Sequence, residues 1–443
     1  MTISVKTFFN NEYVNTASYD NLRKIASVVD GQKNAGRKIL YTILEKNIKE
    51  EIKVSQLGSK IAEFTEYLHG SLDNVVVNLA QNFVGTNNIP MLVREGNFGT
   101  RFTQEASASR YIYTHGSPEF FKLFSKQDSP ILQDQYFEGA KIEPRFFVPE
   151  LPILLINGSE GVSFGFAQKI LPRSPKVLTK LIKDRLAGKK WKETNITPYY
   201  EGFKGTIVQG DTHNQWLIKG AIQRASITRV IITELPIGYD LRSYLEVLDA
   251  LEEKKAIQSY TDQSEDDNFK FEVVFQSKML KDMTDDEVLS HLKLIKKVSE
   301  NYTVVDEFNK IRVFNDVVEI LNHYIDVKLT YLDKRKTYQL SRIQSEIDVD
   351  QSKYYFIEAI VKGNLVVNNR KKADVEADLA KMTNIIQVDG SYDYLLNMNI
   401  MSLTSERMKR LKDAITDKKT ELTALKKLTV GDIWSTTIDG LKF

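Results

Sequence analysis

The sequence contains no cysteine and no long hydrophobic run. Without cysteine the chain can form no disulfide, no thiolate nucleophile and no cysteine-ligated zinc site. No apolar stretch approaches the roughly 18 residues that a membrane-spanning helix needs. The first residues, MTISVKTFFNNEY, lack the charged start and apolar core of a signal peptide. These absences favour a cytoplasmic protein with no membrane partner.

An excess of charge of one sign is also missing. The chain has 61 basic and 59 acidic residues, which gives a net charge of +2. Composition alone therefore does not indicate a nucleic-acid partner, and a surface for one would have to come from local clustering of charge. The 443 residues, 42% of them hydrophobic, are enough for about three domains with sizeable cores.

Hydrophobic periodicity divides the chain into three regions. Up to about residue 150, short helices alternate with loops, and residues 36–51 and 72–83 are the best helix candidates. From 151 to about 310 the pattern is α+β, beginning with a buried strand at 151–158. Further strands are predicted at 204–211, 215–222 and 229–236, and helices at 241–253 and 285–297.

The last region, from about residue 315, is almost wholly helical. Two apolar heptad patterns lie about 70 residues apart, which predicts an antiparallel coiled coil closed by a small helical head. The first pattern comprises Val317, Leu321, Tyr324, Tyr331 and Tyr338, and the second comprises Met408, Leu411, Ile415, Leu422 and Leu425.

Residues 96–115, GNFGTRFTQEASASRYIYTH, contain the best nucleophile candidate, Tyr111. A tyrosine in water has a pKa near 10 and is a poor nucleophile. The guanidinium of Arg110 cannot lose its proton, so it could favour the phenolate or bind a phosphate under attack. Taken alone, an Arg-Tyr pair is more often an ordinary surface pair.

Two further clusters could bind phosphate. Lys33, Arg37 and Lys38 surround the start of the 36–51 helix, where backbone N–H groups add to a positive field. A solvated basic face is the plain alternative. His69, followed by Gly70 at a turn, could reach a phosphate or a leaving oxygen, although a lone histidine is more often structural.

Taken together and in this order, these segments resemble the type IIA DNA topoisomerases. The family motif R-x-x-P-x-x-x-D-G-L-K-P-x-x-R-[RK]-[VI]-L-[YF] stands here as RKIASVVDGQKNAGRKILY, with Ala26, Gln32 and Asn34 replacing the first proline, the leucine and the second proline. The segments KVSQLGSKIAEFTEYLHG, NLAQNFVGTNNIPML, GNFGTR and ASASRYIYT resemble the motifs that follow. LPILLINGSEGVSFGFAQKILP and SYDYLLNMNIMSLTSERMKRL extend the resemblance through nearly the whole chain.

The resemblance implies an α+β multidomain fold, that of the DNA breakage-and-rejoining subunit in this family. The winged-helix domain with the nucleophile would cover residues 1–150, and an α/β tower domain would cover 151–315. Coiled-coil arms would cover 316–443, with a helical dimer gate at about 355–405. The layout is most similar to the medium subunit of T-even-type phage enzymes, which would place the chain in a host cytoplasm.

Residue roles follow by position from the resemblance. Tyr111 would attack DNA, and Arg110, Arg23 and His69 would complete the catalytic set. Lys33, Arg37 and Lys38 would hold the cut DNA, and Val162 would be an apolar wedge that bends the duplex; without the resemblance Val162 reads as a core valine. Leu68 replaces the first histidine of the motif, and the span from His69 to Gln81 is about two residues shorter than in the family.

The resemblance also implies partners and cofactors outside this sequence. We find no ATPase motif and no E-G-D-S with D-x-D-x-D metal set. The acidic residues Glu265, Asp266, Asp267, Asp348 and Asp350 read as solvated surface. We therefore expect a separate ATPase and TOPRIM subunit to bind ATP and to supply most ligands of Mg²⁺, with no metal site in this chain. No DNA-wrapping domain follows residue 430, so relaxation and decatenation are expected rather than active supercoiling.

Two other functions stay open at this point. A non-catalytic DNA-architectural or inhibitor protein would keep the fold but would not need Arg23, Arg110 and Tyr111 together. A purely structural dimeric coiled coil would leave the first half of the chain unexplained. Salt-dependent DNA binding and a covalent Tyr111–DNA adduct separate these alternatives from the enzyme.

Overall fold

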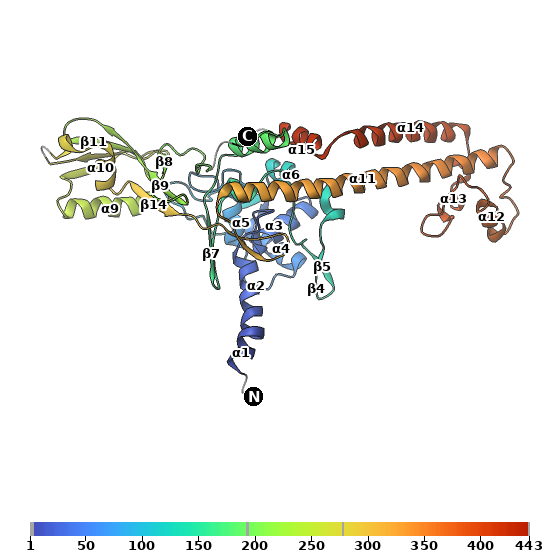
Figure 1. Ribbon diagram of the computed structural model, residues 1–443, viewed down its shortest axis with the longest axis horizontal. Coiled ribbons are helices and arrows are strands. Elements are labelled where there is room, and N and C mark those ends of the chain that lie inside the picture. The colour runs from blue at the N-terminus through green and yellow to red at the C-terminus, as the bar shows by residue number, and fades with distance from the viewer. Residues whose placement is uncertain (1–3, 192–194, 277–278, 442–443) are drawn as a thin grey trace. The chain divides into compact units, whose positions relative to one another are not determined.

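The computed structural model describes residues 4–191, 195–276 and 279–441. The chain divides into two compact units. The first comprises Met1–Lys328 and Thr437–Phe443, and the second comprises Leu329–Thr436. Figure 1 gives the element labels.

The first unit begins with helices and one small sheet. A continuous helical run is formed by α1 (Val5–Phe8), η1 (Phe9–Tyr13) and α2 (Val14–Lys24). Three helices then pack on one another, namely α3 (Asn34–Glu45), α4 (Val54–Thr65) and α5 (Asp73–Ala80). They adjoin an antiparallel sheet of order β1-β3-β2, formed by β1 (Ile52–Lys53), β2 (Leu92–Glu95) and β3 (Tyr113–Gly116).

Helix α3 forms where the sequence predicts a helix, with Ile39, Leu40, Ile43 and Leu44 all buried. It ends six residues earlier than predicted. Asn47 adopts a φ of +51°, in the left-handed region that asparagine tolerates, and the chain then enters β1. The predicted 72–83 helix is likewise present as the shorter α5.

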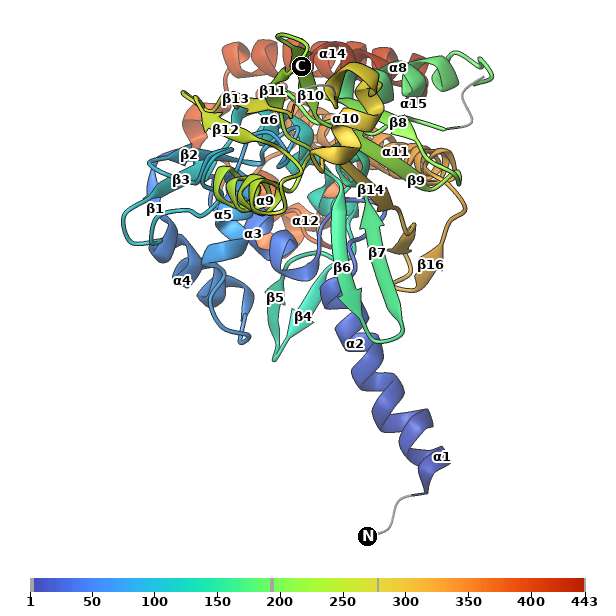
Figure 2. The ribbon, with the colours of Figure 1, turned by 90° about the vertical axis from the view of Figure 1, so that its left-hand side faces the viewer.

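Residues 118–186 continue the first unit. Their elements are α6 (Pro118–Leu123), η2 (Lys126–Ile131), β4 (Gln135–Phe137), β5 (Ala140–Ile142), α7 (Ile153–Asn157), β6 (Ser159–Ser163), β7 (Phe166–Ile170) and α8 (Pro175–Leu186). The strands pair as two hairpins, β4–β5 and β6–β7. In Figures 1 and 2 the β6–β7 hairpin runs beside α2.

The strand prediction for residues 151–158 is wrong, because this segment contains the helix α7. The Gly158 N–H donates to the Leu154 carbonyl at 3.0 Å, in the i to i−4 pattern of a helix. All of Ile153, Leu154, Leu155 and Ile156 are buried. A short apolar run that is buried on every side has no amphipathic period, so its pattern cannot distinguish a helix from a strand.

The rest of the first unit is α+β. Its strands are β8 (Thr206–Gln209), β9 (Gln215–Lys219), β10 (Ala221–Arg224), β11 (Arg229–Glu234), β12 (Ser259–Asp262), β13 (Phe271–Val274), β14 (Ile295–Ser299), β15 (Thr303–Val305) and β16 (Ile311–Val313). Its helices are α9 (Leu241–Glu253), η3 (Leu280–Asp282) and α10 (Asp285–His291). Antiparallel sheets form in the orders β10-β11-β13-β12 and β14-β9-β8, and β15 pairs with β16.

The predicted helix at 241–253 is confirmed as α9. The helix predicted at 285–297 is present only in its first part, as α10. The α9 start is fixed by a capping box in which Asp240 and Ser243 bond each other's backbone N–H groups. After α10, Lys293 turns the chain with a φ of +59°, and Ile295 starts a strand that pairs with β9.

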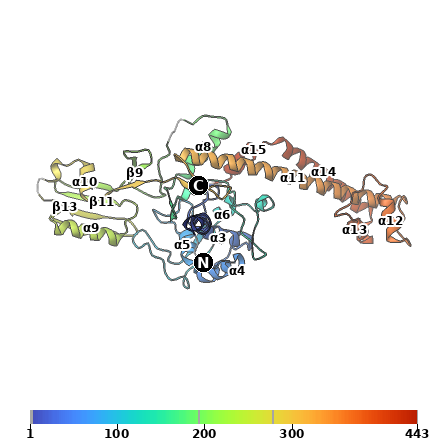
Figure 3. The same cartoon turned by 60° about the horizontal axis from the view of Figure 1, so that its bottom comes forward.

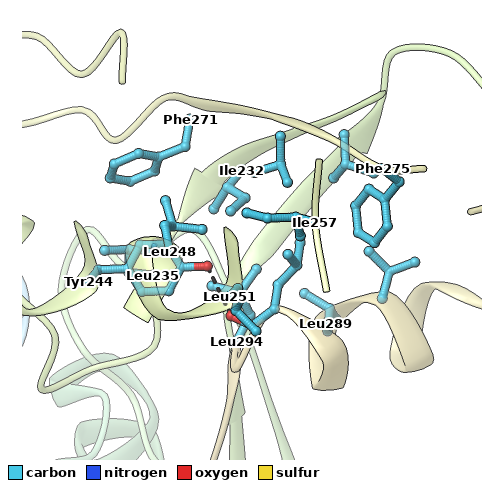
Figure 4. Packing of buried hydrophobic residues seen from close by; sticks show 14 of the residues in the cluster. Ile232, Leu235, Tyr244, Leu248, Leu251, Ile257, Phe271, Phe275, Leu289 and Leu294 are labelled. Carbon is cyan, nitrogen blue, oxygen red and sulfur yellow. Dashed lines mark hydrogen bonds between the residues drawn. The ribbon is translucent and has the colours of Figure 1, made fainter. Parts of the chain in front are cut away.

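A single hydrophobic cluster joins α9 and α10 to the four-stranded sheet (Figure 4). Tyr244 and Leu248 of α9 are fully buried with Ile232 of β11 and Phe271 of β13. The Tyr244 hydroxyl donates to the Leu292 carbonyl at 3.0 Å, which satisfies the polar end of a buried ring.

The second unit contains most of α11 (Val317–Val361), then α12 (Lys372–Leu379), α13 (Asp393–Leu396), η4 (Ile400–Ser402), α14 (Ser405–Lys427) and most of α15 (Val430–Asp439). Figure 3 shows α14 running beside α11. Lys336 of α11 donates to the Leu428 carbonyl at 2.6 Å, whereas Lys418 pairs with Asp350 at 2.9 Å, so the two helices are antiparallel. The end of α11 and the residues between the two helices form a separate small core around Phe356, Leu379 and Leu395.

On the α11 side, the contact with α14 uses other residues than the predicted seam. Tyr338 is 39% exposed, and Ile343 and Ile347 face Ile415 and Leu422 instead. Asp350, predicted as solvated surface, is largely covered because it pairs with Lys418.

Truncation of the α9 core tests this packing. Leu248→Ala should lower the free energy of unfolding by about 2–5 kcal/mol, because a fully buried leucine leaves a cavity. Chemical denaturation followed by circular dichroism measures it. Ile227→Ala, at a residue that is 75% exposed, is the control. Equal small effects of both changes would contradict the assignment of this core.

Candidate functional site

Tyr111 lies on the surface directly before β3. It is 67% exposed, whereas its neighbour Ile112 is 1% exposed. The Tyr111 N–H donates to the Ala108 carbonyl at 2.9 Å, and the Ile112 carbonyl accepts from the Val54 N–H at 3.0 Å. The backbone is fixed on both sides, so the phenol projects into solvent from a rigid position.

The loop that leads to Tyr111 is shaped by a glycine and a buried arginine. Gly99 has a φ of +87°, and a Cβ there would lie 2.5 Å from the Gln104 carbonyl oxygen. Arg101 is 4% exposed, and the sequence interpretation did not single it out. Its guanidinium donates to the carbonyls of Tyr239, Leu235 and Pro236 at 2.5, 2.9 and 3.3 Å. These bonds attach the loop to the segment that follows β11.

Arg110 lies over the ring of Tyr111, with its Cζ 4.8 Å from the ring centroid. This cation–π contact places a permanent positive charge beside the phenol. In the described part of the chain, Arg110 forms no ion pair. Its N–H donors therefore remain available to an incoming anion.

Arg23 and His69 are brought together by a residue that the sequence interpretation did not single out, Tyr19. The Tyr19 hydroxyl hydrogen-bonds Nε2 of His69. The Arg23 Cζ lies 5.6 Å from the centroid of the same tyrosine ring. Tyr67 adds a T-shaped ring contact to His69 at 5.8 Å. The predicted catalytic arginine and histidine thus form one cluster at the end of α2.

The predicted catalytic residues form two separate groups within this single chain. Among the described residues, neither Arg23 nor His69 forms a hydrogen bond, ion pair or ring contact with Tyr111. One group is therefore Tyr111 with Arg110, and the other is Arg23 with His69.

The β6–β7 hairpin carries exposed apolar side chains. Val162 is 72% exposed, and Phe164 and Phe166 are 47% and 40% exposed. The predicted wedge position is thus on the surface, as its role requires, and the plain alternative of a core valine is excluded. Exposure of three apolar side chains on one hairpin to water is unfavourable in free energy, so this cluster marks a contact surface.

The hairpin is attached to the end of α2. The Ser163 hydroxyl donates to the Asp20 carboxylate at 2.7 Å, and Lys33 donates to the Glu160 carbonyl at 2.5 Å. Gly161 permits this approach, because a Cβ there would lie 2.1 Å from the Lys24 carbonyl oxygen. Burial lowers the pKa of Lys33, although the Glu160 carboxylate opposes the shift.

Arg37 and Lys38 do not have the exposed position that the sequence interpretation gave them. Arg37 is 7% exposed and forms a bidentate pair with Asp30, at 2.6 and 3.1 Å. Lys38 is 6% exposed and binds Glu143 at 2.8 Å and the Thr65 carbonyl at 2.6 Å. Since both charges are buried and paired, we revise their role from direct contact with a ligand to support of the fold. Arg37 holds the loop that carries Lys33, whereas Lys38 joins α3 to the end of α4 and to Glu143.

Metal ligands are not gathered in the described residues. No group of three or more His, Asp or Glu side chains there is arranged to hold a metal ion. No helix among them is long and apolar enough to cross a membrane.

Known proteins that resemble this chain agree with one another. The family model that describes the A-type subunits of DNA gyrase and topoisomerase IV matches residues 23–439. The mitochondrial DNA topoisomerase 2 of Dictyostelium discoideum is 32% identical over 99% of this chain and 35% of that protein. DNA topoisomerase 2 of Saccharomyces cerevisiae is 31% identical over 98% of this chain and 34% of that protein. The chain therefore spans about a third of the length of these relatives.

A solved structure matches the fold as well. The Plasmodium falciparum topoisomerase II DNA-binding, cleavage and re-ligation domain superposes with a TM-score of 0.86 at 31% identity. The match covers 99% of this chain and 64% of that one.

The buried position of Arg37 yields a stability test. Arg37→Ala should lower the free energy of unfolding by about 3–5 kcal/mol, because it leaves the Asp30 carboxylate buried without its counter-charge. Denaturant titration measures this, with Arg94→Ala, at an exposed position of β2, as the control. If the two variants were equally stable, Arg37 would not have the supporting role assigned to it.

Proposed function

Because this chain belongs to the family of DNA gyrase and topoisomerase IV A-type subunits, and matches the breakage-and-rejoining region of type IIA topoisomerases, we propose that it cleaves and rejoins duplex DNA through Tyr111. The observation that carries the proposal is the phenol itself. It is two-thirds exposed on a fixed backbone, with one guanidinium beside it.

The proposed reaction is a transesterification. The Tyr111 oxygen attacks a backbone phosphorus, a P–O(Tyr) bond forms, and the bond from phosphorus to the 3′ oxygen breaks. The tyrosine proton is lost, and the 3′ oxygen gains one. The phosphotyrosyl ester stores the energy of the broken bond, so that attack by the 3′ hydroxyl rejoins the strand without an outside energy source.

Cations and hydrogen-bond donors supply the stabilisation that this reaction needs. We assign Arg110 to the attacked phosphate, because its guanidinium already faces the phenol. Arg23 would stabilise charge that develops in the transition state, and His69 would interact with a phosphate or leaving oxygen. Arg23 is suited to this role, since it forms no ion pair among the described residues.

DNA would lie across α2 and the β6–β7 hairpin. Lys33 would contact the phosphate backbone beside the hairpin. Val162 would insert between base pairs and bend the duplex, and its 72% exposure supports this. Arg37 would act indirectly, by holding the loop in which Lys33 lies, and Lys38 by fixing α3 to the end of α4 and to Glu143.

The chain would contain three domains. Residues 1–150 would form the winged-helix domain, 151–315 the tower, and 316–443 the coiled-coil arms with a dimer gate near 355–405. Two copies would pair so that two tyrosines cut opposite strands. No set of three or more possible metal ligands is gathered among the described residues. Mg²⁺ and ATP would be bound by the ATPase and TOPRIM regions of a separate subunit, outside these residues.

A Tyr111→Phe variant tests the nucleophile. The chain would be mixed with its ATPase and TOPRIM partner, supercoiled plasmid, Mg²⁺ and ATP, and then treated with denaturant and protease. Wild type should give linear DNA with a tyrosine-linked peptide at its 5′ ends. The variant should give none, because phenylalanine has no attacking oxygen. Salt-dependent DNA binding without any adduct from the assembled wild type would instead favour the non-catalytic alternative.

A Val162→Ser variant tests the wedge. Loss of the apolar side chain should weaken binding to a bent duplex by about tenfold, since burial of a valine contributes roughly 1.5 kcal/mol. Energy transfer between dyes at the two DNA ends would report the bend. Val313→Ser, at another valine that is 62% exposed, is the matched control. Equal bending by the two variants would rule out the wedge.

A further inference from the structure

The aromatic cluster at the end of α2 contains one residue that the proposed function has not used. Tyr19 precedes Arg23 by one helical turn and touches both members of the second catalytic group. Its hydroxyl bonds Nε2 of His69, and its ring lies under the Arg23 guanidinium. Although it is 52% exposed, its side chain is thus engaged at both its polar and its apolar surface.

We propose that Tyr19 is a positioning residue for DNA cleavage, which orients His69 and Arg23 as one unit. This inference rests on the proposed function of the chain as a strand-cleaving enzyme. In it, Tyr19 does not touch the reacting atoms but fixes the two side chains that do.

Within its own segment, the His69 ring has a contact with the Tyr67 ring at 5.8 Å but, among the described residues, no hydrogen bond. It lies between Glu66, with a φ of +51°, and Gly70, with a φ of +88°, and α5 does not begin until Asp73. Leu68 beside it is 75% exposed and does not pack into a core. An imidazole on such a turn is free to rotate unless a hydrogen bond restrains it.

Tyr19 can provide that restraint because its helix is held firmly. Asp20, the next residue, accepts from the Ser163 hydroxyl at 2.7 Å and pairs with Lys24 at 3.0 Å. Burial raises the pKa of the Asp20 carboxyl, but these two bonds outweigh burial and keep that pKa below its ordinary value. Ala26 lies two residues past the helix, and the Gln168 side chain bonds both its N–H and its carbonyl.

The hydrogen bond also selects which imidazole nitrogen faces a ligand. The contact joins the Tyr19 hydroxyl and Nε2. In the proposed arrangement the hydroxyl donates and Nε2 accepts, so Nδ1 carries the ring proton and can donate to a DNA oxygen. The Arg23 guanidinium lies over the Tyr19 ring, and this contact restrains the same tyrosine side chain at its aromatic face. The tyrosine therefore assigns donor chemistry to His69 and limits the positions that Arg23 can take.

Kinetics of Tyr19→Phe test the proposal. The variant keeps the ring under Arg23 and removes only the hydroxyl. In the assembled enzyme we expect the cleavage rate at saturating DNA to fall by about tenfold, with DNA affinity unchanged. Tyr136→Phe, at an exposed tyrosine of β4, is the control. An unchanged rate for Tyr19→Phe would overturn the proposal.

A double-mutant cycle distinguishes positioning from a general structural effect. If Tyr19 acts through His69, adding Tyr19→Phe to His69→Gln should cause no further loss of rate. Independent, multiplicative losses would overturn the proposal, because a tyrosine that acts elsewhere would still matter when His69 is absent.

A spectroscopic measurement on the full chain alone separates this inference from the proposed function. The sequence has five histidines, so ¹⁵N imidazole signals can be assigned by single substitutions. His69 should show the Nδ1–H tautomer in wild type and lose it in Tyr19→Phe. The same tautomer in both proteins would contradict the role of Tyr19. Lack of a Tyr111 adduct, with the tautomer change present, would instead contradict only the proposed enzyme activity.

Discussion

The arrangement of the site depends on the hydrogen bonds and the ion pair that the buried carboxylate of Asp30 accepts. It accepts the N–H of Gln32 at 2.9 Å, the N–H of Phe147 at 3.0 Å and both arms of the Arg37 guanidinium. It thereby fixes the turn after α2, the first turn of α3 and a segment more than a hundred residues away. Gly31 completes the turn, because a Cβ there would lie 2.4 Å from the Leu154 nitrogen. Lys33 and the end of α2 take their positions from the buried pair of Asp30 and Arg37. Loss of either partner would leave the other charge buried without its counter-charge and would disturb the surface that carries Lys33.

The end of α2 is a second point of convergence. Three side chains near the end of the helix have different contacts. Tyr19 bonds His69 in the turn after α4, Asp20 accepts from Ser163 in the hairpin, and Arg23 lies over the Tyr19 ring. Polar bonds dominate these contacts, and each is short-range and directional. As a result, the wedge hairpin and the His69 turn share one support, while Tyr111 is supported separately by β3 and by the loop that Arg101 holds.

Sequence reasoning succeeded where periodicity or a motif determines the outcome. The amphipathic pattern gave α3 and the full extent of α9, and family motifs directed attention to Tyr111 and Val162, both of which are exposed. It failed for α7, because a uniformly apolar run has no period. It also misplaced Arg37 and Lys38, since a basic cluster looks the same in sequence whether its partners are phosphates or the distant carboxylates Asp30 and Glu143. Tyr19 and Arg101 carried no local signal, because their hydrogen-bond partners lie tens of residues or more away along the chain.

Arg101 has a consequence for how this protein can change over evolutionary time. Its three hydrogen bonds end on backbone carbonyls, at positions 235, 236 and 239, whereas its ion pair with Glu234, at 3.7 Å, uses a side chain. Side chains at those positions can drift without breaking the contact, provided the backbone path is kept. Position 101 has no such freedom, because only a guanidinium presents several donors in a fixed planar fork. Tolerance to substitution is therefore distributed unequally across this contact, with one partner constrained and the other free to vary.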